Sequence, residues 1–138
     1  MNRNILFAIV PCLLLSGCGD TIHGKSVAEP QIAAFHQNLD ARRFEEIYSA
    51  ASPEFRRAAP KEKVFALFSA IGEKLGKVQA ASTTSWNVRT FNFVTTVVLV
   101  EGTRFEHGAG TETFTFRVDG DKASLVGYNI NSLDMLTR

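Results

Sequence analysis

The stretch Thr111-Glu112-Thr113-Phe114-Thr115-Phe116-Arg117-Val118 decides the fold. Its odd-numbered positions are threonines and an arginine, and they alternate with Glu112 and then with apolar residues. Successive side chains of a β-strand point to opposite faces, so Phe114, Phe116 and Val118 share one face with Glu112. The other face carries threonines and an arginine. The stretch therefore predicts a strand with one apolar face and one polar face.

Three further runs rich in Val, Thr, Ser and aromatic residues are predicted as strands, over residues 78–90, 93–105 and 124–130. The turn sequences His107-Gly108-Ala109-Gly110 and Asp119-Gly120-Asp121 separate the later runs, as expected for hairpins. One face of this antiparallel sheet is expected to collect five core residues, namely Phe114, Phe116, Val126, Tyr128 and Ile130.

The residues before the strands follow helical periodicity. Pro30 suits the first turn of a helix, a second helix follows Asp40, and Ser52-Pro53 interrupts it. A further helix is predicted over residues 61–75, with Gly76 as its C-terminal cap. The apolar positions recur at spacings of three and four; they are Ile32, Phe35, Leu39, Phe44, Ile47, Tyr48, Val64, Phe65, Phe68, Ile71 and Leu75.

This order of elements sets the fold class. Helices first and hairpin strands second, without β-α-β alternation, predict a single α+β domain over residues 30–138. In it, N-terminal helices pack on a four-stranded antiparallel sheet. We expect the helix over residues 61–75 to cover the sheet face that bears Phe114 and Phe116.

The N-terminus has the organisation of an exported lipoprotein. Residues 1–17 combine a cationic start with a short apolar run, which predicts a signal peptide. The tetrapeptide Leu15-Ser16-Gly17-Cys18 resembles the bacterial lipobox, in which the cysteine is diacylated and becomes the first residue. Residues 18–29 are then expected to be a lipidated cysteine and a flexible tether. In bacterial lipoprotein sorting an aspartate directly after the cysteine signals inner-membrane retention. Gly19 stands there, so we expect the outer membrane, facing the periplasm.

Composition excludes several classes of function. The chain has 15 basic and 14 acidic residues, and removal of residues 1–17 takes away only Arg3, which leaves 14 of each. A balanced charge argues against nucleic acid as a partner. Cys12 lies in the signal peptide and Cys18 would carry lipid, so no thiol remains for a disulfide, for thiolate catalysis or for a zinc site.

Four short segments within residues 30–131 carry a family resemblance; they are Phe44-x-x-Ile47-Tyr48, Ser52-Pro53-Glu54-Phe55-Arg56, Leu75-Gly76-Lys77 and Leu125-Val126-Gly127-Tyr128. They resemble an uncharacterised family of small bacterial exported proteins. The resemblance implies the cone-shaped fold of the nuclear transport factor 2-like and cystatin-like group, with a curved sheet, and it supplies no catalytic residues. The chain departs from the family at Ala123-Ser124, where similar sequences often carry a tryptophan.

Candidate site residues are few. The three histidines, His23, His36 and His107, lack the spacing of metal ligands, and we expect no metal and no cofactor. In the cone folds that the resemblance implies, a pocket can lie between the helices and the sheet. The residues that could line it are Tyr48, Glu112, Tyr128 and His36. Because Glu112 shares the parity of Phe114 but lies near a strand end, we expect it to be partly exposed and to form no buried pair with a histidine or tyrosine.

Three classes of function remain open. The preferred class is a non-catalytic, lipid-anchored binding or interaction protein of the cell envelope, since no set of catalytic residues is recognisable. The alternative is a small-ligand pocket protein, or an isomerase- or dehydratase-like enzyme that uses the cone cavity. The third is a structural envelope component. Partners would be the membrane through lipid on Cys18, and an envelope protein or a small apolar ligand; the oligomeric state stays open.

Overall fold

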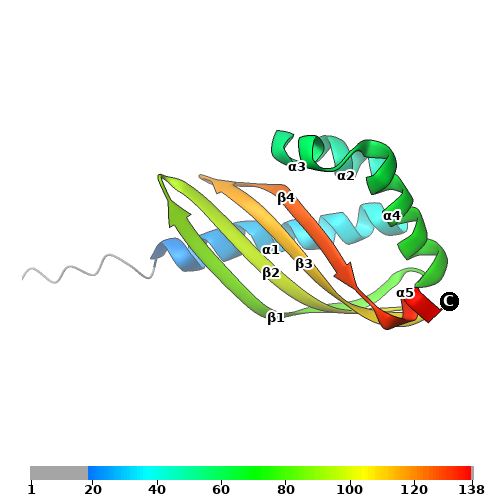
Figure 1. The fold of residues 1–138 in the computed structure, drawn as a ribbon. Coiled ribbons are helices and arrows are strands. Elements are labelled where there is room, and N and C mark those ends of the chain that lie inside the picture. Colours follow the sequence, from blue (N-terminus) through cyan, green and yellow to red (C-terminus); the bar gives the residue numbers. More distant parts are fainter. Residues whose placement is uncertain (1–18, 138) are drawn as a thin grey trace, which may run out of the picture.

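The structure is an α+β fold in which helices precede the strands, as predicted, and a further short helix follows the last strand (Figure 1). The computed structural model describes residues 19–137. The helices within that range are α1 (Gly19–Asp40), α2 (Phe44–Ala50), α3 (Pro53–Ala58), α4 (Lys61–Lys74) and α5 (Leu133–Thr137). The strands are β1 (Val78–Phe91), β2 (Val94–Phe105), β3 (Gly108–Asp119) and β4 (Lys122–Asn131).

The strands form one antiparallel sheet in the order β1-β2-β3-β4, so each strand pairs with the next along the chain. The predicted strands match the observed ones, although β3 and β4 are a few residues longer than expected. β1 and β4 lie at opposite edges, so the sheet is an open meander. Helices pack on one of its faces.

One irregularity in the β3–β4 pairing changes which side chains face the core. Thr115 pairs with Gly127, but Phe116 pairs with Leu125, so Val126 is an extra residue in β4. Such a bulge reverses the alternation of side chains along the strand. Leu125 is therefore buried beside Phe116 and Val126 is only half-buried. Our placement of Val126 on the core face is wrong for this reason.

The helix α1 includes residues 19–29, which we expected to form an irregular tether. The side of this segment that faces the sheet carries small residues. Ala28 is fully buried, and a Cβ atom at Gly24 would lie 3.2 Å from side-chain atoms of both Val88 and Val97. Small residues let the helix approach the sheet closely, but they add no apolar periodicity, which is why the sequence pattern did not predict a helix here.

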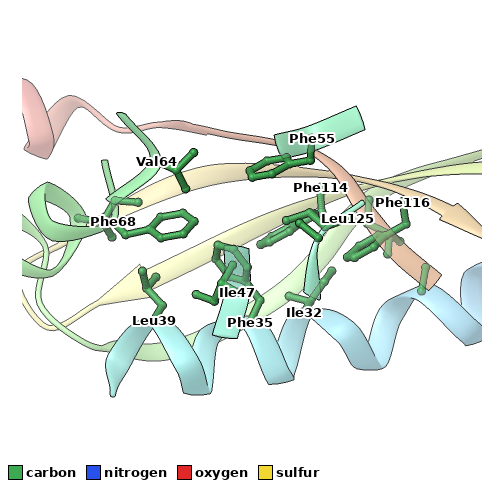
Figure 2. Close-up of a cluster of buried hydrophobic side chains, with 14 of the residues drawn as sticks. Ile32, Phe35, Leu39, Ile47, Phe55, Val64, Phe68, Phe114, Phe116 and Leu125 are labelled. Carbon is green, nitrogen blue, oxygen red and sulfur yellow. The ribbon is translucent and has the colours of Figure 1, made fainter. Parts of the chain in front are cut away.

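The core is built around an aromatic residue of α1 (Figure 2). The ring of Phe35 lies 5.1 Å from Phe114 on β3 and 4.8 Å from Tyr128 on β4, measured between centroids. Phe68 of α4 approaches the same ring at 5.5 Å, edge to face. Edge-to-face pairs of this kind add roughly 0.5–1.5 kcal/mol each to the gain from burial. Phe35 thus joins the sheet, α1 and α4 in one cluster.

The helix that covers the sheet is α1, and not the helix over residues 61–75 as we expected. The helix α1 contacts all four strands, whereas α4 packs mainly on α2, α5 and α1 and comes near the sheet through Phe68. The two helices also differ in length. The 22 residues of α1 extend roughly 33 Å, and the 14 residues of α4 extend only roughly 21 Å.

We predict that Phe114→Ala lowers the free energy of unfolding by about 3–5 kcal/mol, because it leaves a cavity between Phe35 and Tyr128. The matched control is Thr115→Ala, one residue away on the opposite face, which should cost far less. Equilibrium unfolding in urea measures both. Equal losses in the two variants would mean that the register of β3 is wrong.

Candidate functional site

The most buried acidic side chain among the described residues is Glu112 of β3, at 0% exposure. Its Oε2 accepts hydrogen bonds from Nε2 of His36, at 2.7 Å, and from Oγ1 of Thr103, at 2.5 Å. Its Oε1 accepts a hydrogen bond from the hydroxyl of Tyr128, at 2.7 Å. We call Glu112, His36, Thr103 and Tyr128 the buried acid cluster.

The donors to Glu112 of β3 come from three other elements, which are β2, β4 and α1. Thr103 lies on β2, two residues from Glu101, which pairs directly with Glu112. Tyr128 lies on β4 and pairs with Phe114, the next inward residue after Glu112. Residues two apart on a strand share a face, so both donors point to the same side as the carboxylate. His36 reaches it from α1, next in sequence to the core residue Phe35.

Our expectation for Glu112 is therefore wrong in two respects, since the residue is fully buried and it bonds both a histidine and a tyrosine. The expectation failed for two reasons. β3 begins at Gly108, so Glu112 lies within the strand and not near its end, and His36 of α1 covers the carboxylate. Of the four predicted pocket residues, the structure brings together Glu112, His36 and Tyr128. Tyr48 lies elsewhere, on α2, where its hydroxyl is 3.2 Å from the carbonyl oxygen of Arg56 and 3.1 Å from that of Ala59.

The cluster stabilises a charged carboxylate next to a neutral phenol. Burial alone would raise the pKa of Glu112, but the hydrogen bond and charge of His36, with the bonds from Thr103 and Tyr128, outweigh burial and lower the pKa. Burial, and then the charge and hydrogen bond of Glu112, raise the pKa of Tyr128 well above its ordinary value of 10.0. A carboxylate only accepts hydrogen bonds, so His36 must carry a hydrogen on Nε2.

A second acid, Glu101 of β2, lies directly opposite Glu112 in the β2–β3 pairing and is only 4% exposed. Burial raises the pKa of Glu101, against the opposing effect of a hydrogen bond from Thr83. The Thr83 hydroxyl is 2.6 Å from Glu101 and 3.1 Å from Glu29 of α1. A hydroxyl has one hydrogen, so Thr83 can donate to only one of these acids at a time. Lys25 also donates to Glu29.

A groove between α1 and β1 adjoins the cluster. Its volume is about 280 Å³, and its lining residues are Glu29, Ile32, Ala33, His36, Ala81, Ser82, Thr83 and Glu101. His36 therefore touches both the groove and the buried carboxylate, whereas Glu112 is not part of the lining. Phe114, which lies 5.9 Å from the His36 ring, and Phe35 fill the space beside the cluster. The cluster is therefore packed against aromatic side chains.

Sequence reasoning missed Thr103, Glu101 and Thr83. The signal for Glu101 was present, because it alternates with Val97 and Leu99 along β2 just as Glu112 alternates with Phe114 along β3. An acid at an inward position of each of two adjacent strands indicates a buried acidic pair. The sequence could not predict that His36 lies next to this acidic pair, because strand pairing does not determine where a helix packs on the sheet.

The remaining predicted residues do not join the cluster. Cys18 lies outside the described residues. His23 of α1 lies 3.5 Å from Asp121 and 3.2 Å from the carbonyl oxygen of Gly120, in the β3–β4 turn. His107 lies in the β2–β3 turn, where its backbone N–H donates to Leu75. Among the side chains that the structure describes, those of residues 22–137, no group of three from His, Cys, Asp or Glu could hold a metal ion.

We predict different effects for two matched variants of the acidic pair. At pH 7, Glu112→Gln should lower the free energy of unfolding by about 1–3 kcal/mol, since it removes charge-assisted hydrogen bonds from a buried site. Glu101→Gln should leave stability unchanged or raise it, because it removes a charge that burial disfavours.

The pH dependence distinguishes the two acids. The lowered pKa of Glu112 contributes stability above its ordinary pKa of 4.5, and this contribution is lost as pH falls through the folded value. The raised pKa of Glu101 has the reverse effect, so the benefit of Glu101→Gln should shrink on acidification. Urea unfolding at pH 7 and at pH 4 measures both, and parallel profiles for the two variants would contradict the assignment.

Two further findings concern membrane-spanning helices and similarity to known proteins. No helix within residues 19–137 is both long enough and apolar enough to cross a membrane. Comparisons with protein-family models, with curated proteins and with solved structures find no match to this chain.

Proposed function

We propose that this protein is a lipid-anchored component of the bacterial cell envelope with a non-catalytic binding or interaction role. The observation that carries the proposal is the lipobox-like Leu15-Ser16-Gly17-Cys18, which follows an apolar run and directly precedes α1. Acyl chains on Cys18 would anchor the protein firmly, since each buried methylene contributes about 0.8 kcal/mol. Gly19 after the cysteine supports the outer membrane, facing the periplasm.

The packing around Glu112 supports a structural role for the buried acid cluster. Both carboxylate oxygens already accept hydrogen bonds from protein groups, and aromatic rings occupy the space beside them. A general acid or base needs a substrate within hydrogen-bond reach. Glu112 has no surface exposed to solvent, so a substrate could reach its carboxylate only if the side chains that cover it moved.

We further propose the cone-shaped architecture of the nuclear transport factor 2-like and cystatin-like group. Helices on one face of an open antiparallel meander support it. The partner would be another envelope protein or a small apolar ligand. The balanced charge of the chain beyond the signal peptide supports neither nucleic acid nor a strongly charged partner.

The alternative is a small-ligand pocket protein, or an isomerase- or dehydratase-like enzyme. One observation favours it: His36, which bonds Glu112, also lines the groove between α1 and β1. A ligand in that groove would contact an imidazole coupled to a buried carboxylate. A small molecule that raises the melting temperature of the protein, but not of an Ala33→Trp variant with a filled groove, would favour this alternative.

The test of the anchor uses the two cysteines of the chain, Cys12 and Cys18. Cells that express the protein are labelled with radioactive palmitate. The wild type and Cys12→Ala should incorporate label and sediment with membranes, whereas Cys18→Ala should not incorporate label. Equal labelling of Cys18→Ala and the wild type would overturn the proposed anchor.

A further inference from the structure

The tip of the β1–β2 hairpin carries exposed aromatic side chains that the fold does not use. Phe91 is 73% exposed and Phe93 is fully exposed, with the half-exposed Val94 beside them. We call Phe91, Asn92, Phe93 and Val94 the aromatic tip. Exposed apolar residues that cluster at one site mark a surface for a membrane or a partner, whereas single exposed ones need no explanation.

The backbone conformation at the aromatic tip is unfavourable for Phe93. Phe91 pairs with Val94, so Asn92 and Phe93 form a two-residue turn, and their φ angles are +48° and +63°. Turns with two positive φ angles favour Asn followed by Gly. A bulky side chain in this conformation is an outlier, and such strain collects at functional sites. Phe93 therefore stands where folding alone would favour glycine.

The aromatic tip lies at the end of the molecule where α1 begins (Figure 1). A Cβ atom at Gly24 would lie 3.6 Å from the Thr95 side chain, so α1 passes over the hairpin just behind its tip. Gly19 is five residues before Gly24, roughly 8 Å along the helix. Phe93 is two residues from Thr95, roughly 7 Å along the strand. Cys18 immediately precedes Gly19 in the sequence.

The start of α1 adds a further apolar group near this end. Ile22, one turn or less from Gly24, is exposed, with two-thirds of its surface open to solvent. The neighbouring β3–β4 turn, which His23 contacts at Gly120, is polar, so the apolar side chains of this end gather on the aromatic tip and on α1. A lipid on Cys18 would hold this same end of the molecule against a bilayer.

We propose that the aromatic tip inserts into the bilayer that holds the lipid of Cys18, and so fixes the orientation of the domain on the membrane. The proposal rests on the anchor proposed above. Amphipathic helices of peripheral proteins bury their apolar face about 5–10 Å into the boundary between headgroups and acyl chains, and we expect a similar depth for the aromatic tip. With Cys18 and Phe93 both in the membrane, the opposite end of the sheet, with α4 and α5, faces away from it.

The experiment places one tryptophan at the aromatic tip of the full, lipidated chain. The variant Phe93→Trp also carries Trp86→Phe, because Trp86 is the only tryptophan of the wild type. Phe91→Trp with Trp86→Phe gives a second reporter at an ordinary strand position, should the turn not accept Trp. The proteins are reconstituted into vesicles of phosphatidylcholine and phosphatidylglycerol, with and without bromine on the acyl chains. The wild type, with Trp86 about five strand positions from the tip, is the matched control.

Both tip reporters should shift their emission to shorter wavelength on the vesicles and be quenched by bromine, while Trp86 should be quenched much less. Phe93→Gly should unfold at the same or a higher urea concentration than the wild type, since glycine relieves the strained turn. Palmitate labelling of the same preparations reports on the anchor. A labelled chain whose tip reporters are not quenched would overturn the membrane insertion alone and indicate a protein partner for the tip. A chain without label would overturn the anchor, and the insertion with it.

Discussion

The contact of α1 with the inner face of the sheet is the interaction on which the rest of the structure depends. Two adjacent residues of α1 lie at its centre. Phe35 packs on Phe114 and fills the core, while His36 bonds Glu112 and makes the burial of an acid tolerable. Without the helix, both the aromatic core and the carboxylate would be open to water. The same contact fixes the start of α1 at the end of the sheet where the β1–β2 hairpin turns.

The buried acidic pair shows how neighbouring positions of one sheet acquire different chemistry. Glu112 of β3 and Glu101 of β2 lie opposite each other in the strand pairing. Glu112 has three hydrogen-bond donors around it and its pKa is lowered, whereas the pKa of Glu101 is raised by burial. Glu101 depends on the hydroxyl of Thr83, which it shares with Glu29. An ionised Glu112 raises the cost of ionising Glu101, so the pair favours one charge over two.

Strand pattern predicted more of this protein than helix pattern did. The alternation along residues 111–118 identified the sheet. Among the helix signals, the C-terminal cap was predicted correctly, because Gly76 follows α4 in the left-handed conformation, at φ +78°. Predictions from hydrophobic periodicity failed in two segments where the apolar residues do not recur at a regular spacing. Small residues such as Gly24 and Ala28 bring α1 onto the sheet without an apolar stripe, and the bulge at Val126 shifts the register of β4. The burial of Glu112 depends on α1, so no property of β3 alone could predict it.

The central claim, that α1 covers the sheet through Phe35, can be tested by a double-mutant cycle. Phe35→Ala, Phe114→Ala and the double variant are unfolded in urea, and the coupling free energy is taken from the three losses of stability. Side chains in contact couple by about 0.5–3 kcal/mol, whereas distant ones are additive within about 0.5 kcal/mol. The structure predicts coupling in the first range. Additive losses would contradict it, because they would mean that α1 does not rest on β3.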